Sequence, residues 1–265
     1  MSAPLLVLDV GNTSLKIGLA AGDEDIAAYG FATEALGFAD ALGFAVLEVC
    51  RQGGVSPRGL AAWAVSSVVP RLDGVIRQAA ARYCGCPALF VPDGLPLPVE
   101  NRYERPAEVG ADRLVAAYGA MRLFDAPGYV VIDFGTATTF DCVLPGVYLG
   151  GLICPGLMSS ARALAGGTAK LPQADLALGA GPVRFGRSTA ESLAYGLVHG
   201  FAAMVEGICA RLKPFLPEGS LVVGAGGLAE VVARATPAID VLRPDLLLEG
   251  LRLAHEEATR STPRA

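Results

Sequence analysis

The chain has 265 residues and a formal net charge of −5, and its composition is 52% hydrophobic and 18% charged. This length accommodates one large domain or two modest ones, and the acidic balance argues against nucleic acid and acidic membranes as partners. There is no unbroken apolar run of about 18 residues, so no membrane span is predicted. The first apolar run ends at Asp9 and is therefore interpreted as a strand rather than a signal peptide.

The first half of the chain begins with strand signals and continues with helical ones. Residues 4–20 predict a β-hairpin around a Gly-Asn-Thr-Ser turn. The remaining elements expected in this half are a strand in 24–33, a helix in 38–52, a strand in 59–70, a helix in 71–85, a short strand in 88–93, an irregular proline-rich segment in 92–108 and a helix in 110–124.

The second half repeats this order. The expected elements are a three-stranded meander in 129–156, a helix in 157–167, a long helical region in 187–215, a strand, Gly-rich turn and helix in 219–235, a short strand in 238–242 and a last helix in 246–260. Hairpin strands followed by alternating helices and strands predict an α/β fold with two duplicated subdomains, residues 1–125 and 126–265. Each subdomain would have a mixed sheet flanked by helices, with a ligand cleft between the two.

An aspartate stands at the end of a buried strand in both halves. Asp9 follows Leu5–Leu8 and Asp133 follows Val130–Ile132, and in each case a glycine lies two residues further on, with hydroxyl residues close by. A buried carboxylate is costly unless it is paired, hydrogen-bonded or bound to a cation. Glycine-rich turns offer backbone N–H groups to phosphate oxygens, and a nearby carboxylate can hold the cation that neutralises phosphate charge.

These features resemble the actin-like (ribonuclease H-like) superfamily of sugar kinases, acetate kinase and chaperone ATPases. A narrower resemblance is to type III pantothenate kinase. It is carried, in order, by DVGNTSLKIGLA, SSVVP, EVGADRLVAA, VVIDFGTATTFDCV, YLGGLICPGL, GTAKLP, GRSTAES and RPDLLLEGL, which cover residue 5 to about residue 253. The resemblance implies ATP-dependent phosphorylation of pantothenate to 4'-phosphopantothenate, the first step of coenzyme A biosynthesis. It also implies a homodimer, a monovalent cation such as K⁺ or NH₄⁺, and Mg²⁺ accompanying ATP.

The resemblance also assigns roles to individual residues. Asp112 matches the proton acceptor for the substrate hydroxyl, and Asp133 matches the monovalent-cation ligand. The ATP-binding positions would be Asp9, Val10, Gly11, Asn12, Thr13, Ser14, Leu15, Lys16 and Thr136, with Asp9 approaching the Mg²⁺–phosphate group. The substrate-binding positions would be Tyr103, Gly110, Ala111, Asp112, Arg113 and Thr189, with Arg113 facing the pantothenate carboxylate. Arg102 and Arg105 depart from the family pattern around Tyr103, where the family more often has Pro and Asn.

Each assignment has a structural alternative. Asp112 could be a first-turn acid that complements a helix dipole, and Asp133 a plain turn residue. Tyr103 could serve only packing, and Thr189 could be only a helix N-cap followed by Glu191. The six cysteines show no metal or disulfide pattern and are interpreted as reduced small apolar residues, which favours a cytoplasmic protein.

Two other functions remain open at this stage. One is a kinase of the same superfamily acting on a different small alcohol. The other is a non-catalytic nucleotide-binding regulator with this fold, for which loss of the carboxylate at position 112 would be expected. The sequence retains that carboxylate.

Overall fold

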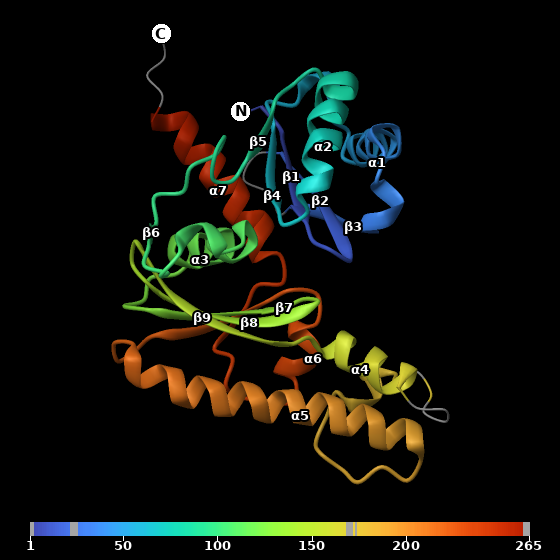
Figure 1. The fold of residues 1–265 in the computed structure, drawn as a ribbon, viewed down its shortest axis with the longest axis vertical. Coiled ribbons are helices and arrows are strands. Elements are labelled where there is room, and N and C mark those ends of the chain that lie inside the picture. The colour runs from blue at the N-terminus through green and yellow to red at the C-terminus, as the bar shows by residue number, and fades with distance from the viewer. Residues whose placement is uncertain (1–2, 22–25, 168–171, 173, 262–265) are drawn as a thin grey trace. The chain divides into compact units, whose positions relative to one another are not determined.

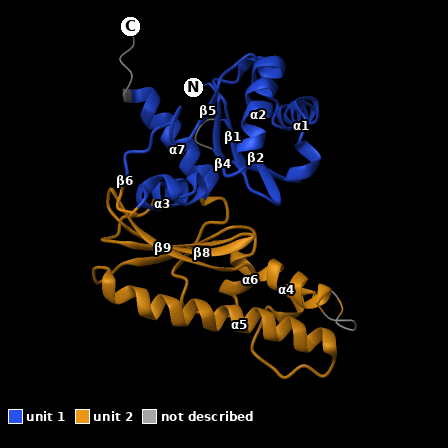
Figure 2. Ribbon diagram, viewed as in Figure 1, with its two compact units in different colours: residues 1–99, 105–122, 247–265 blue, residues 100–104, 123–246 orange. Residues whose placement is uncertain are grey.

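The computed structural model describes residues 3–21, 26–167, 172 and 174–261. The chain forms two compact units (Figure 2). Unit 1 comprises residues 1–99, 105–122 and 247–265, and unit 2 comprises residues 100–104 and 123–246. Most of the predicted GTAKLP motif lies outside the described residues.

Unit 1 is built on a five-stranded mixed sheet in the order β3-β2-β1-β4-β5. The strands are β1 (Leu5–Val10), β2 (Ser14–Ala20), β3 (Ala27–Ala32), β4 (Trp63–Ser67) and β5 (Ala88–Phe90). β1 pairs antiparallel with β2 and parallel with β4. The predicted hairpin at residues 4–20 is therefore confirmed.

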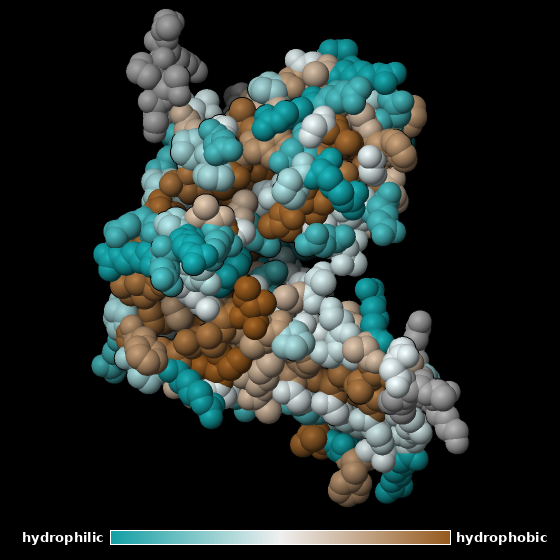
Figure 3. All heavy atoms as spheres, in the orientation of Figure 1, coloured by the Kyte–Doolittle hydropathy of each residue, from teal (hydrophilic) through white to brown (hydrophobic). Residues whose placement is uncertain are grey.

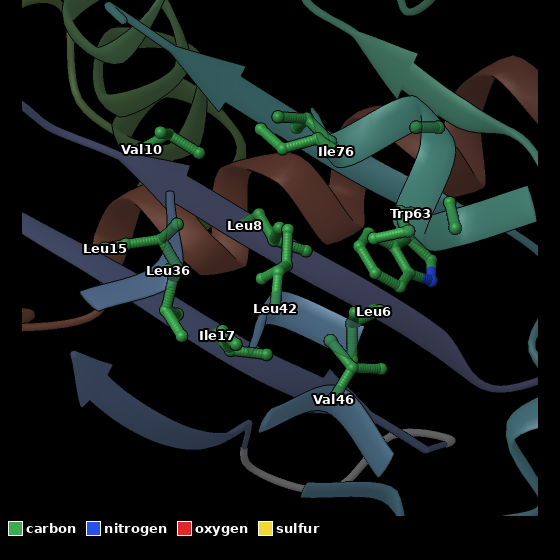
Figure 4. Close-up of a cluster of buried hydrophobic side chains, with 14 of the residues drawn as sticks. Leu6, Leu8, Val10, Leu15, Ile17, Leu36, Leu42, Val46, Trp63 and Ile76 are labelled. Atoms are coloured by element: carbon green, nitrogen blue, oxygen red, sulfur yellow. The ribbon is translucent and has the colours of Figure 1, made fainter. Parts of the chain in front are cut away.

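Helices cover both faces of this sheet (Figure 1). They are α1 (Ala39–Gln52), α2 (Asp73–Ala79), α3 (Ala111–Leu123) and α7 (Leu246–Ser261). Leu6, Leu8 and Val10 point to the face that packs against α1 and α2, and Figure 4 shows this cluster with Leu42, Val46 and Ile76 among its members. Leu5 and Val7 alternate to the opposite face and pack with residues of α3 and α7.

Unit 2 contains a six-stranded sheet in the order β11-β10-β7-β8-β9-β6. The strands are β6 (Glu100–Asn101), β7 (Tyr129–Phe134), β8 (Ala137–Leu144), β9 (Val147–Pro155), β10 (Leu221–Ala225) and β11 (Val241–Leu242). β7, β8 and β9 form the predicted antiparallel meander. β6 was not expected, because residues 92–108 were interpreted as irregular; it pairs parallel with β9 at the sheet edge.

Three helices of unit 2 are α4 (Leu157–Gly166), α5 (Thr189–Leu212) and α6 (Ala229–Ala233). Val130, Ile132 and Phe134 of β7 pack with Val198 and Val205 of α5 in one core cluster. The segment Thr189–Phe215 also meets the length and composition criteria for a membrane span, contrary to the expectation of no such segment. This is weak evidence for a membrane, since a core helix of a soluble protein meets the same criteria.

The two sheets share one topology. If β6 is left aside, the unit 2 order β9-β8-β7-β10-β11 corresponds to the unit 1 order β3-β2-β1-β4-β5. Asp9 and Asp133 each occupy the fifth position of a six-residue strand, and in β1 and β7 this aspartate is the one partly exposed residue of an otherwise buried strand. The predicted pair of mixed, helix-flanked sheets is confirmed.

The compact units and the predicted halves differ at the C-terminal helix. Leu248, Leu251 and Ala254 of α7 belong to the same core cluster as Leu5 and Val7, so α7 lies in unit 1 although it ends the second half of the chain. The division at residue 125 as a boundary between duplicated subdomains stays a prediction.

Candidate active site

The first Asp-Gly turn joins β1 to β2 in unit 1. Asp9 is partly exposed and lies opposite Lys16 of β2 and Ser66 of β4 in the sheet register. Asn12, Thr13 and Ser14 are exposed at the tip, whereas Val10 and Leu15 are fully buried core residues. Any contact of Val10 or Leu15 with a nucleotide would therefore come from the backbone.

This first turn is held in place by a buried threonine outside it. The Thr33 hydroxyl donates a hydrogen bond of 2.7 Å to the carbonyl oxygen of Gly11, and the Thr33 N–H donates to the carbonyl of Thr13 at 3.1 Å. Gly11 N–H donates across the turn to Ser14 O at 3.0 Å. These hydrogen bonds fix the turn, and its tip residues are exposed to solvent.

The start of α3 lies on the same face of the unit 1 sheet as the Asp9 side chain. Ala111 and Val115 pack with Val7, and alternation along β1 places Asp9 on the face of Val7. The Asp112 carboxylate folds back over Gly110, where a side chain would collide with it, and accepts a 2.8 Å hydrogen bond from Arg113 N–H. Two carboxylates, Asp9 and Asp112, therefore belong to one face of unit 1.

Burial gives Asp112 the character of a base. Desolvation raises the pKa of Asp112 above its ordinary value, although the backbone hydrogen bond from Arg113 and the positive charge of Arg113 act in the opposite direction. Arg113 is itself only 8% exposed. A carboxylate with a raised pKa takes up a proton more readily than an ordinary aspartate at the same pH.

The second Asp-Gly turn joins β7 to β8 in unit 2, and it is enclosed by glycines. A Cβ on Gly226, where φ is +88°, would lie 2.5 Å from Asp133 Oδ1 and 2.9 Å from the Phe134 backbone. A Cβ on Gly135 would lie 3.1 Å from Asp133 Oδ2. Each carboxylate oxygen of Asp133 therefore lies against a glycine. We call Gly135 and Gly226 around this carboxylate the glycine cradle; a side chain at either position would crowd the carboxylate.

Thr136 stands at the exposed tip of this second turn. Its carbonyl oxygen accepts a 2.6 Å hydrogen bond from the Ser159 hydroxyl of α4, while Gly135 N–H donates to Ala137 O at 3.0 Å. A hydroxyl from outside the turn thus fixes a turn carbonyl, as Thr33 does in unit 1.

Tyr103 and Thr189 also lie in unit 2. Tyr103 follows β6, and its ring lies 6.5 Å from the ring of Tyr148 on β9. Thr189 is the exposed first residue of α5. The helix N-cap is Ser188, whose hydroxyl accepts a hydrogen bond from Glu191 N–H at 3.2 Å, so the interpretation of Thr189 as the N-cap is wrong.

The candidate residues fall into both compact units. Unit 1 holds Asp9–Lys16 and Gly110–Arg113, and unit 2 holds Tyr103, Asp133, Thr136 and Thr189.

Comparison with known proteins identifies the family. The family model for type III pantothenate kinase matches residues 5–211. A type III pantothenate kinase from Nitratidesulfovibrio vulgaris is 50% identical over 258 residues, which are 97% of this chain and 98% of that protein. The chain belongs to the type III pantothenate kinase family. A member from Myxococcus xanthus is 40% identical over 252 residues, 95% of this chain and 97% of that protein.

Solved structures agree on the fold. A protein from Campylobacter jejuni described as a Baf family transcriptional activator has a TM-score of 0.60 at 16% identity, covering 96% of this chain and 99% of that one. A ROK family glucokinase from Streptomyces griseus has a TM-score of 0.53 at 13% identity, covering 96% and 99%. At such identities the likeness shows the fold alone, which is that of the actin-like sugar kinases.

Membership in the family makes this chain a kinase that phosphorylates pantothenate with ATP in coenzyme A biosynthesis. A kinase that uses ATP needs a divalent metal such as Mg²⁺. No group of three or more His, Cys, Asp or Glu side chains among the described residues is arranged to hold a metal. Mg²⁺ is usually held by one or two carboxylates together with substrate phosphates and water.

The structure adds residues that the sequence analysis did not single out. Thr33 and Ser159 fix the carbonyls of the two turns, and Gly226 closes the cradle around Asp133. The sequence indicates Gly226 only as part of the Gly-rich turn expected in 219–235. For Thr33 and Ser159 the sequence gives no signal beyond a single hydroxyl residue, since both contacts span more than 20 positions along the chain.

Proposed function

We propose that the two turns and the start of α3 have separate roles in the kinase reaction. The Asp9–Lys16 turn binds the ATP phosphates through the exposed backbone and hydroxyls of Asn12–Ser14, with Asp9 placed for the Mg²⁺–phosphate group. Its support is the set of hydrogen bonds that fixes the turn, because a turn that is already ordered needs little further ordering to bind a ligand at its exposed tip. Bound Mg²⁺ would supply positive charge to the phosphates.

Asp112 is the proton acceptor for the primary hydroxyl of pantothenate. The observation that carries this assignment is a half-buried carboxylate with a raised pKa at the first turn of α3, on the same sheet face as Asp9. Arg113 follows directly and offers a buried guanidinium for the pantothenate carboxylate. A non-catalytic regulator of this fold would have no need of such a pair.

Asp133 is the ligand of a monovalent cation, K⁺ or NH₄⁺. Its support is the glycine cradle, which lets the backbone approach both carboxylate oxygens beside the exposed tip at Thr136, the proposed ATP contact. The cation would offset the cost of placing a carboxylate at the end of a buried strand. Tyr103 lines the pantothenate pocket, and Thr189 contacts pantothenate either from its own subunit or across the dimer. The cap at Ser188 leaves Thr189 available for this role.

The enzyme is a cytoplasmic homodimer that associates through unit 2. Unit 2 exposes large apolar side chains, among them Val183 and Phe185 with 71% and 89% of their surface exposed, and Figure 3 shows hydrophobic side chains on this unit's surface. Gly196, Gly200 and Ala203 are small exposed residues on α5 that would allow a second copy to approach closely. Burying such a surface would stabilise the pair.

A coupled assay that follows ADP release tests the catalytic assignment. With pantothenate, ATP, Mg²⁺ and K⁺, the Asp112→Asn variant should fold normally and lose about 10²–10⁴-fold in kcat. The isosteric amide keeps the helix N-terminus and cannot accept the proton. A variant that keeps more than about a tenth of the wild-type kcat would contradict the assignment.

Light scattering tests the homodimer. The wild type should show twice the chain mass of 27.2 kDa at micromolar concentration. Phe185→Ser should shift the mass toward the monomer, whereas Phe215→Ser, which removes a ring that is 80% exposed elsewhere on unit 2, should not. A monomeric wild type, or equal behaviour of the two variants, would contradict the proposed surface.

A further inference from the structure

An aspartate–tyrosine pair is buried in the unit 2 sheet beside Tyr103. Asp141 is 1% exposed and Tyr148 is fully buried, and the Tyr148 hydroxyl donates a 2.7 Å hydrogen bond to Asp141 Oδ1. A carboxylate buried this deeply is costly, and a hydroxyl that donates to it lowers that cost. The bond in turn fixes the orientation of the Tyr148 ring, which has only two side-chain torsions.

A β-bulge places the two side chains on one face. Asp141 lies opposite Gly151 of β9, whereas Val143 lies opposite Tyr148, and the register shifts between Cys142 and Val143. Side chains alternate between the faces of a regular strand, so Gly151 and Tyr148, three positions apart, would otherwise face opposite sides. The bulge resets the alternation and brings Tyr148 onto the face of Asp141.

The same tyrosine supports the segment that carries Tyr103. The Arg102 N–H donates to the Tyr148 carbonyl at 2.9 Å, and the Tyr103 N–H donates to Asn101 Oδ1 at 3.0 Å. The Tyr103 ring lies 6.5 Å from the Tyr148 ring at an interplanar angle of 47°. It also lies over Gly150, where a Cβ would be 3.7 Å from the ring.

We infer that Asp141 and Tyr148 are positioning residues for pantothenate, acting through Tyr103. Asp141 orients Tyr148, and Tyr148 together with Gly150 forms the surface on which the Tyr103 ring rests. The inference rests on the proposed role of Tyr103 in the pantothenate pocket. Its consequence is that the hydrogen bond between Tyr148 and Asp141 affects pantothenate binding without touching ATP or the transferred phosphoryl group.

The test is a double-mutant cycle between Tyr103 and Tyr148 with KM and kcat measured for both substrates. Tyr148→Phe keeps the ring and removes the hydroxyl, and it should raise the KM for pantothenate about three- to tenfold. The kcat and the KM for ATP should stay within about twofold of wild type. In the Tyr103→Ala background, Tyr148→Phe should raise the pantothenate KM no further, because Tyr148 acts only through Tyr103.

Tyr129→Phe is the matched control. Tyr129 is a tyrosine of the same sheet with 2% of its surface exposed, and its hydroxyl donates a 2.7 Å hydrogen bond to the Phe124 carbonyl. It should lose stability as Tyr148→Phe does and leave the pantothenate KM unchanged. Asp141→Leu, if it folds, should reproduce the KM of Tyr148→Phe.

The outcomes distinguish failure of the proposed role of Tyr103 from failure of the positioning role of Asp141 and Tyr148. If Tyr103→Ala leaves the pantothenate KM unchanged, the proposed role of Tyr103 is overturned, and the inference with it. If Tyr103→Ala raises that KM while Tyr148→Phe does not, or if the two effects add in the double variant, the positioning role alone is overturned. An equal rise of KM in Tyr129→Phe would also overturn it, because the effect would then be one of general stability.

Discussion

The two Asp-Gly turns start from the same strand pattern and end in different environments. Each aspartate is the fifth residue of a six-residue strand, and each turn has one carbonyl held by a hydroxyl from outside, Thr33 on Gly11 and Ser159 on Thr136. The unit 1 turn is longer and exposes Asn12–Ser14. The unit 2 turn is shorter and has its carboxylate enclosed by Gly135 and Gly226.

The roles proposed for the two turns follow from this difference. An open tip with several exposed donors suits a polyphosphate and its accompanying Mg²⁺, which keeps part of its own hydration. A carboxylate enclosed by glycines suits a single weakly hydrated cation held close to the backbone. The comparison therefore predicts that changes in one turn alter the response to Mg²⁺–ATP, and that changes in the other alter the response to K⁺.

Among changes within the two turns, the largest effect should come from Asp9→Asn. Loss of this carboxylate removes the side chain proposed for the Mg²⁺–phosphate group, and we expect kcat/KM for ATP to fall about 10²–10³-fold. The ratio of the rates in K⁺ and Na⁺ should stay as in the wild type. Initial rates measured over a range of Mg²⁺ concentrations at fixed ATP check this. A changed ratio of the rates in K⁺ and Na⁺ would show that the two turns do not have separate roles.

Gly226→Ala should weaken the second turn selectively. The added Cβ would lie 2.5 Å from Asp133 Oδ1, and the backbone there has φ +88°, so a strain of about 1–3 kcal/mol is expected. The K⁺ concentration for half-maximal activity should rise about tenfold. Gly227→Ala is the control, since a Cβ there meets no atom within 4 Å. Similar K⁺ titrations for both variants would show that the cradle does not hold the cation.

A smaller effect should follow from removing the hydroxyls that hold the turns. Thr33→Val should raise the KM for ATP about two- to tenfold, and Ser159→Ala should raise the K⁺ requirement by a similar factor, since each loses one hydrogen bond. The two variants are matched, because the bonds are 2.7 Å and 2.6 Å long and both end on a turn carbonyl. If Thr33→Val altered the K⁺ requirement as strongly as Ser159→Ala, the two turns would not act separately.

The smallest effect concerns the pH dependence of stability. Burial raises the pKa of Asp112 in the folded chain above its unfolded value of about 3.9. Between these two pKa values the folded state therefore binds more protons than the unfolded state. The contribution of Asp112 is therefore fully present below the unfolded pKa and is lost as pH rises through the folded pKa. As the pH rises from the unfolded to the folded pKa, the Asp112→Asn variant should become more stable relative to wild type. Urea denaturation at pH 4 to 7 measures it, and a constant or falling difference would contradict the raised pKa.

Local patterns in the sequence were sufficient to predict most helices and strands. The hairpin at 4–20, α1 with its stop at Gly53 and the meander from β7 to β9 follow from alternation and turn residues. The equivalence of Asp9 and Asp133 also follows from the sequence, because both end an apolar strand.

Contacts between distant segments could not be predicted in the same way. β6 has two residues, too few to show any periodicity, and its parallel pairing with β9 depends on the fold. The amphipathic pattern of α7 does not specify which sheet it covers, and this helix packs in unit 1. The choice of Ser188 over Thr189 as N-cap depends on backbone geometry at adjacent hydroxyl residues.

The most direct test of the account is the dependence of the initial rate on the monovalent cation. Rates with pantothenate, ATP and Mg²⁺ would be measured in K⁺, NH₄⁺, Na⁺ and tetramethylammonium at constant ionic strength, for wild type and Asp133→Asn. We expect high rates in K⁺ and NH₄⁺, low rates in Na⁺ and tetramethylammonium, and a loss of this preference in Asp133→Asn. Equal wild-type rates in all four cations would contradict the assignment of Asp133 to a monovalent cation.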